Sequence, residues 1–186
     1  MATRIEPLMI VADLDLMPDD GNRYELIEGE LIVSRAPGLS HQRVIGNLLT
    51  NLNNYLVQNP IGVAWTTPGV IFDEYHSVIP DIVYVSNRRR SEIASGERIT
   101  GAPELLVEVV SPGTENARRD RIAKRQSYSK YGVQEYWIAD PENRSVEIYR
   151  LRDQILELIA TLTGTDEITS PLLPDFRCEV KSIFAA

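Results

Sequence analysis

The stretch that decides the fold is ELLVEVV at residues 104–110, followed by a helical segment at 116–131 and by EYWIA at 135–139. The first run is nearly all apolar, which is typical of a central strand covered on both faces. Gly132 follows the helical segment and is a common kind of helix stop. A strand, a helix and a second strand in this order predict a β-α-β crossover. The sequence therefore predicts an α/β (α+β) fold, in which helices flank a mixed sheet.

The segments before and after this unit add further strands and one long helix. A hairpin is predicted over 24–34 with Gly29 at the bend, and a helix from Ser40, its expected N-cap, up to Asn59. The stretch 87–101 is polar and is expected to be a loop with a helical turn. Strands are predicted at 62–66, 69–73, 81–85 and 145–150, and two short strands and a turn are expected near the C-terminus.

Length and composition predict one domain over residues 1–186. Cys178 is the only cysteine, so the chain has no intrachain disulfide and no cysteine-based zinc site. No apolar stretch approaches the ~18–20 residues of a membrane span, so no membrane partner is expected. The first residues resemble no signal peptide, and the expected location is therefore cytoplasmic.

The net charge of −8 argues against a protein that coats nucleic acid through a broad basic surface. It is compatible with a nuclease, because active-site carboxylates add negative charge that a bound metal offsets. Positive charge gathers at 88–90 and at 118–125, and we interpret both clusters mainly as solvated faces.

Two acids lie next to or within apolar runs that read as strands. Asp81 begins the run DIVYV, and Glu108 lies inside ELLVEVV. Carboxylates are seldom buried unless they are paired or bound to a metal, and two on neighbouring core strands repel each other unless a cation lies between them. Together with Lys124 on the next helix, they suit metal-assisted phosphodiester hydrolysis.

The strand period sorts the side chains around Glu108. Leu106, Glu108 and Val110 are expected on one face and Val109 on the other, with the carbonyl of Val109 positioned to face a metal. Lys124 is expected on the sheet-facing stripe of its helix. An alternative for Lys124 is an ordinary i,i+4 ion pair with Asp120 on the helix surface.

The ordered combination of motifs resembles the Uma2 family of restriction-endonuclease-like proteins, which belongs to the PD-(D/E)xK nuclease fold. The motifs that carry the resemblance are YELIEGE at 24–30, PDIV at 80–83, EVVSP at 108–112, residues 120–124, and GVQEYWIADP at 132–141. The resemblance implies a single restriction-endonuclease-like domain built on a mixed sheet flanked by helices.

The resemblance also assigns site residues. It implies that Asp81 and Glu108 are metal-binding acids, that the Val109 carbonyl is a further ligand, and that an earlier acid takes part. Glu28 matches that acid, with Glu25 and Glu30 as competitors in the same hairpin.

This chain departs from the general nuclease pattern at one position. Val110 stands where that pattern has lysine, and the family resemblance moves the lysine to the following helix, at Lys124. Of the two histidines, His41 is interpreted as a helix cap or surface group, and His76 as a turn residue.

These observations predict an endodeoxyribonuclease, a hydrolase that uses Mg²⁺ or Mn²⁺ and takes DNA as its substrate. Asp81, Glu108, Lys124 and Glu28 are its expected catalytic residues. One alternative is a catalytically degenerate nuclease-fold protein that binds DNA or a protein partner without cleavage. Another is a metal hydrolase acting on a small phosphoester. The sequence leaves a homodimer open, since nucleases that cut both strands often act as symmetric dimers.

Overall fold

The computed structural model describes residues 8–111 and 115–185, and for Ser95 and residues 115–120 it describes the backbone alone. The main sheet has the strand order β12-β11-β10-β9-β6-β3. Strands β9 and β10 are parallel, and every other neighbouring pair is antiparallel. Its strands are β3 (Gly62–Thr66), β6 (Ile82–Ser86), β9 (Leu105–Val109), β10 (Glu135–Asp140), β11 (Ser145–Arg152) and β12 (Ile155–Thr163).

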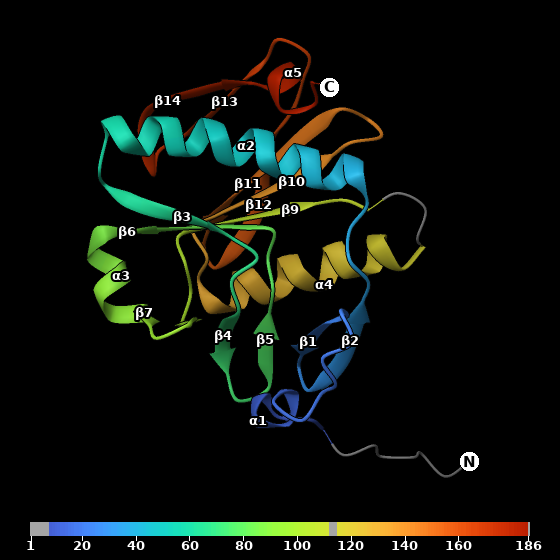
Figure 1. The fold of residues 1–186 in the computed structure, drawn as a ribbon. Helices are drawn as coiled ribbons and strands as arrows, with labels where there is room; N and C mark the ends of the chain where they lie inside the picture. Colours follow the sequence, from blue (N-terminus) through green and yellow to red (C-terminus); the bar gives the residue numbers. More distant parts are fainter. Residues whose placement is uncertain (1–7, 112–114, 186) are drawn as a thin grey trace.

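Two long helices cover opposite faces of this sheet, α2 (Leu39–Gln58) and α4 (Glu115–Tyr131) (Figure 1). Helix α4 connects β9 to β10, which confirms the predicted β-α-β crossover. Leu105, Val107 and Val109 pack into the core on the α2 side, whereas Leu106 packs into the core on the α4 side. The alternation expected along β9 is therefore present, and it directs Glu108 toward α4.

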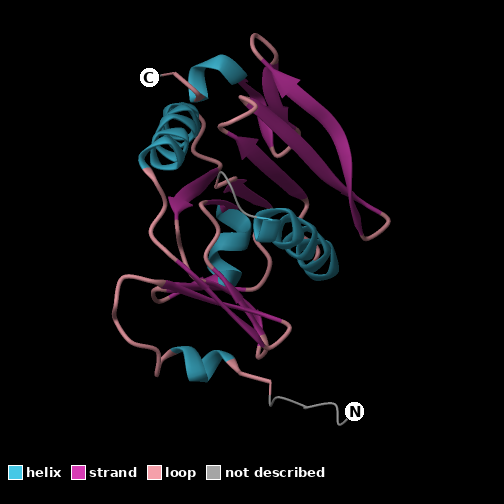
Figure 2. Ribbon diagram, turned by 90° about the vertical axis from the view of Figure 1, so that its right-hand side faces the viewer, coloured by secondary structure: helices cyan, strands magenta, loops and turns pink. Residues whose placement is uncertain are grey.

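A second sheet lies beyond α4, so that this helix is sandwiched between the two sheets (Figures 1 and 2). Its strand order is β2-β1-β5-β4-β8-β7. It begins with the predicted hairpin, and Gly29 lies in the bend with a positive φ of 79°. The strands are β1 (Arg23–Ile27), β2 (Glu30–Ser34), β4 (Val70–Asp73), β5 (His76–Val78), β7 (Ala94–Ser95) and β8 (Arg98–Thr100).

Smaller elements complete the fold. Helix α1 (Val11–Leu14) precedes the hairpin, and α3 (Asn87–Ile93) follows β6. Strands β13 (Glu167–Ser170) and β14 (Leu173–Glu179) pair with each other, and α5 (Val180–Ile183) contacts α2. Phe176 and Cys178 of β14 are buried in the core on the α2 side. None of the described helices is long and apolar enough to cross a membrane.

Four expectations of local structure were wrong. After β11 the chain forms the strands β12, β13 and β14 and the helix α5, instead of two short strands and a turn. Helix α2 begins at Leu39 with Gly38 as its N-cap, so Ser40 is already inside the first turn. His76 lies in β5 and is 1% exposed, not in an exposed turn. The stretch 87–101 contains α3, β7 and β8 instead of a loop with one helical turn. Strands of two or three residues are too short to show a period in the sequence.

Candidate active site

Three acidic side chains and one lysine meet on the α4 side of the main sheet. Glu25 comes from β1, Asp81 directly precedes β6, and Glu108 lies in β9. Lys124 Nζ is 3.1 Å from Glu108 Oε1 and 3.2 Å from Glu25 Oε1. Asp81 Oδ2 accepts a hydrogen bond of 2.8 Å from the amide of Val109, the residue after Glu108. The structure therefore brings Asp81, Glu108 and Lys124 together, as the sequence predicts.

Helix periodicity explains why Lys124 reaches the acids. Lys124 and Tyr128 are one turn apart on the same face of α4, and both point to Glu108. The Tyr128 hydroxyl donates a hydrogen bond of 2.9 Å to Glu108 Oε1, and the Tyr128 ring is fully buried. The Lys124 side chain is only 14% exposed. The alternative partner Asp120 has a side chain outside the described residues.

Asp81 is 2% exposed and is held by donors from three parts of the chain. These donors are the Val109 amide, His41 Nε2 at 3.1 Å from Oδ2, and Arg23 Nη1 at 3.4 Å from Oδ1. Burial by itself raises the pKa of Asp81, but the hydrogen bond and charge of His41 and the Val109 amide outweigh burial and bring the pKa below its ordinary value. Asp81 is therefore an ionised ligand candidate.

Glu108 and Lys124 respond to burial in opposite ways. Burial raises the pKa of Glu108 to about 7, the charges of Asp81 and Glu25 add to this rise, and Lys124 opposes it. Burial alone would lower the pKa of Lys124, but Glu108 and Glu25 outweigh it and raise that pKa. Lys124 therefore stays protonated at neutral pH. The three carboxylates of the cluster outnumber its two permanently charged cations, Lys124 and Arg23, and the raised pKa of Glu108 reflects this excess together with burial.

Glu28 does not join the cluster, which corrects its expected position. Glu28 and Gly29 form the two-residue bend of the hairpin, with φ of 53° and 79°. Positive φ at both central residues is typical of a type I′ turn. The Glu28 side chain is 70% exposed, and its Oε1 lies 3.7 Å from Lys130 Nζ. The hairpin acid that reaches the site is Glu25, which is 5% exposed and also accepts a hydrogen bond from the Ile79 amide.

His41 is the residue whose position sequence reasoning missed. It lies in the first turn of α2, is 5% exposed, and its Nε2 contacts Asp81. Its Nδ1 is buried and has no hydrogen-bond partner among the described residues. The only signal in the sequence was its helical spacing from Val44, Ile45 and Leu48, which places it on the buried face of α2.

The site fits a divalent ion in its chemistry. Within the described ranges, no three His, Cys, Asp or Glu side chains converge at metal-binding spacing. Mg²⁺, however, is usually bound through one or two carboxylates with water completing its shell. Asp81 Oδ1 has only the long contact with Arg23, and Glu108 Oε2 accepts no hydrogen bond from a described residue. These two oxygens and the uncompensated negative charge suit a hard cation. The expected role of the Val109 carbonyl stays a prediction.

A mixed sheet with a parallel crossover, helices on both faces and acids on neighbouring strands defines a restriction-endonuclease-like fold. The chain belongs to the Uma2 family, because the family model described as "Putative restriction endonuclease" matches residues 11–181. The fold is similar to the crystal structure of a putative nuclease belonging to DUF820 from Anabaena variabilis ATCC 29413. The TM-score is 0.77 at 20% sequence identity, over 95% of this chain and 97% of that chain. No curated protein matches the chain.

Proposed function

We propose that this protein is an endodeoxyribonuclease that uses Mg²⁺ or Mn²⁺ to hydrolyse phosphodiester bonds in DNA. Its family supports a nuclease. The observation that carries the proposal is the position of Lys124, whose Nζ lies 3.1 Å from Glu108 Oε1. An ammonium group from α4 is thus beside the strand acid, although Val110 stands at the strand position where the general nuclease pattern has lysine.

The proposed roles follow from the contacts. Asp81 and Glu108 would hold the ion, and the Val109 carbonyl would be a further ligand. A bound Mg²⁺ or Mn²⁺ would supply Lewis-acid polarisation of the phosphate and a more acidic water. Lys124 orients the attacking water or stabilises negative charge that develops on the phosphate oxygens.

The surrounding residues position this machinery. Glu25 and Tyr128 fix Lys124 and Glu108 in place through the ion pair and hydrogen bond described above. His41 and the Val109 amide orient the Asp81 carboxylate. We assign no catalytic role to Glu28, because its side chain faces solvent.

A nuclease-fold protein that binds without cleavage is the second candidate. It is favoured by Val110 in place of the strand lysine and by the net charge of −8. The two candidates differ in the use of Lys124, since a protein that only binds needs no ammonium group beside Glu108.

A cleavage assay separates the two candidates. Purified protein is incubated with Mg²⁺ or Mn²⁺ and with single-stranded, duplex and supercoiled DNA. We expect metal-dependent cleavage that Glu108→Ala abolishes and that Glu28→Ala, the exposed acid of the hairpin, leaves intact. DNA binding without cleavage under all these conditions would favour the second candidate. Equal cleavage by wild type and Glu108→Ala would refute the assigned site.

A further inference from the structure

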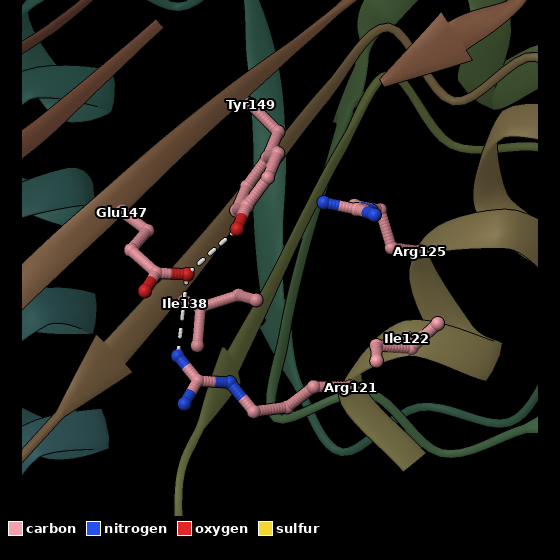
Figure 3. Close-up of a pocket in the computed structure, with 6 residues that line it drawn as sticks. All are labelled: Arg121, Ile122, Arg125, Ile138, Glu147 and Tyr149. Carbon is pink, nitrogen blue, oxygen red and sulfur yellow. Dashed lines mark hydrogen bonds and ion pairs between the residues drawn. The ribbon is translucent and has the colours of Figure 1, made fainter. Parts of the chain in front are cut away.

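A cavity lined by charged, aromatic and aliphatic side chains lies beside the candidate active site, between α4 and the main sheet (Figure 3). Its volume is about 180 Å³, several times the ~30 Å³ that one water molecule occupies in the liquid. The lining residues come from α4, β10 and β11, and they are Arg121, Ile122, Arg125, Ile138, Glu147 and Tyr149. The metal-binding acids and Lys124 do not line it.

Strand register places this cavity next to Glu108. Ile138 in β10 pairs with Glu108 on one side and with Glu147 of β11 on the other. The three residues form one row across three neighbouring strands, on the face that α4 covers. Neighbouring strands are ~4.8 Å apart, so Glu147 lies about 10 Å from Glu108 along this row. The cavity therefore lies on the same face and in the same row of the main sheet as Glu108.

The cavity contains two arginines and one acid. Arg121 Nη2 lies 3.2 Å from Glu147 Oε2, which also accepts a hydrogen bond of 2.8 Å from the Tyr149 hydroxyl. Arg125 lies over the Tyr149 ring, with Cζ 5.3 Å from the ring centroid. Arg125 forms no ion pair with any carboxylate in the described part of the chain. Figure 3 shows both guanidinium groups facing the space between helix and strands.

The cavity has a net positive charge, whereas the whole protein has a net negative charge. Two guanidinium groups and one carboxylate leave the cavity with an excess of one positive charge, whereas the chain carries −8. Glu147 occupies one nitrogen of Arg121 and holds that side chain in place, so that the other nitrogens remain donors. The guanidinium fork matches the geometry of phosphate oxygens, and it donates several hydrogen bonds to one phosphate group.

We propose that Arg121 and Arg125 bind a phosphodiester group of the DNA strand adjacent to the group that is cleaved at Glu108 and Lys124. This inference rests on the proposed function for the identity of the strand. Lys124 is the next residue to Arg125 on α4, so one helix presents an ammonium group to the scissile phosphate and two guanidinium groups to its neighbour. Ile122, which is 48% exposed, supplies apolar surface for the sugar between the two phosphates.

Binding is measured separately from cleavage, by fluorescence anisotropy of labelled duplexes in EDTA over a series of KCl concentrations. Each phosphate contact on duplex DNA contributes about 0.9 to the slope of log K against log salt. We expect the double variant Arg121→Gln/Arg125→Gln to lower that slope by about 0.9, because both side chains contact one phosphate group, and each single variant to lower it by part of that amount, with equal losses on duplexes of unrelated sequence. Arg125→Lys keeps the charge and should retain most of the slope.

Arg88→Gln is the matched control, because Arg88 is exposed on α3 and its loss changes the net charge equally. Unchanged slopes in both cavity variants, or the same change in Arg88→Gln, would overturn the inference. If the cavity variants cleave DNA and their slopes are unchanged, the subsite is refuted and the proposed nuclease function is retained. Reduced slopes in the cavity variants, combined with a wild-type protein that cleaves no DNA, would support the subsite and refute the nuclease activity. Circular dichroism checks that each variant is folded.

Discussion

Lys124 of α4 lies 3.2 Å from Glu25 of β1, a residue 99 positions earlier in the chain. This ion pair connects the second sheet to α4, the helix that carries the candidate catalytic lysine. Both side chains are largely buried, so the pair is held with little competition from water. Glu25 and Glu108 therefore fix the ammonium group of Lys124 from two sides.

Glu25 and Glu28 form a matched pair of acids in one hairpin. Glu25→Gln should lower the free energy of unfolding by about 1–3 kcal/mol, because a buried charge-assisted contact is lost. Glu28→Gln should change it by no more than about 0.5 kcal/mol, as expected for an exposed side chain. Urea unfolding of both variants measures the difference. Equal effects would show that Glu25 does not hold the site together.

Replacement of the lysine tests its role in catalysis. Lys124→Ala should lower the rate of cleavage by ~10²-fold or more, the scale of losing one transition-state donor. Binding of Mn²⁺, followed by calorimetry, should persist because the ligands remain. If Lys124 serves only as the ion-pair partner of the buried acids Glu25 and Glu108, cleavage should stay near the wild-type rate while stability falls by about 3–5 kcal/mol.

Val110→Lys in the Lys124→Ala background is the sharper form of this test. Leu106 and Val110 flank Glu108 on the same face of the strand, so a lysine at 110 returns an amine to the usual position. We expect partial recovery of cleavage. Val110→Met is the control, because it adds a long side chain without charge and should recover nothing.

The raised pKa of Glu108 predicts a pH dependence of stability. Its pKa in the folded state, about 7, is above the ordinary value of 4.5, so Glu108 costs nothing below pH 4.5 and destabilises the fold increasingly as the pH rises through 7. Glu108→Gln removes this cost. The stability of the variant relative to wild type should increase between pH 5 and pH 8, by about 3 kcal/mol at most. Denaturant unfolding at several pH values in EDTA measures it, and a constant difference would contradict the assignment.

Metal ions should stabilise the native state. Mg²⁺ or Mn²⁺ that binds only the folded protein raises the free energy of unfolding by about 2.7 kcal/mol at 100 times its dissociation constant. Asp81→Asn and Glu108→Gln should each reduce the accompanying rise in melting temperature. Asp73→Asn serves as the control, because Asp73 lies away from the cluster and accepts a hydrogen bond from the Tyr131 hydroxyl. An undiminished rise in both site variants would remove Asp81 and Glu108 as ligands.

Sequence reasoning succeeded where the signal was local and strong. The apolar run around Glu108 and the helix after it predicted the crossover, and strand and helix periods placed Glu108 and Lys124 on facing surfaces. The hairpin acid that reaches the site was harder to identify from the sequence, because Glu25, Glu28 and Glu30 lie within six residues. Only the backbone conformation of the bend, which turns Glu28 to solvent, decides among them.

The contacts that sequence reasoning could not supply are those between distant segments. His41 precedes its partner Asp81 by 40 residues, and a single histidine near a helix start gives no indication of a buried acid. The pairing of β1 with β5 likewise joins segments that are far apart, through a strand of only three residues. Such contacts depend on how segments distant in the chain come together in the tertiary fold, which no local pattern encodes.

The position of α4 between the two sheets makes the site sensitive to partial opening of the native state. Glu25 belongs to the second sheet and Glu108 to the main sheet. Any opening of the native state that separates the second sheet from α4 therefore moves the two carboxylate partners of Lys124 apart. Amide hydrogen exchange would detect such an opening as early exchange in β1 and β5, while Trp137 in the main sheet stays buried. The contacts of Lys124 are then only as stable as the weaker of the two docked layers, and the candidate site would come apart before the core of the main sheet unfolds.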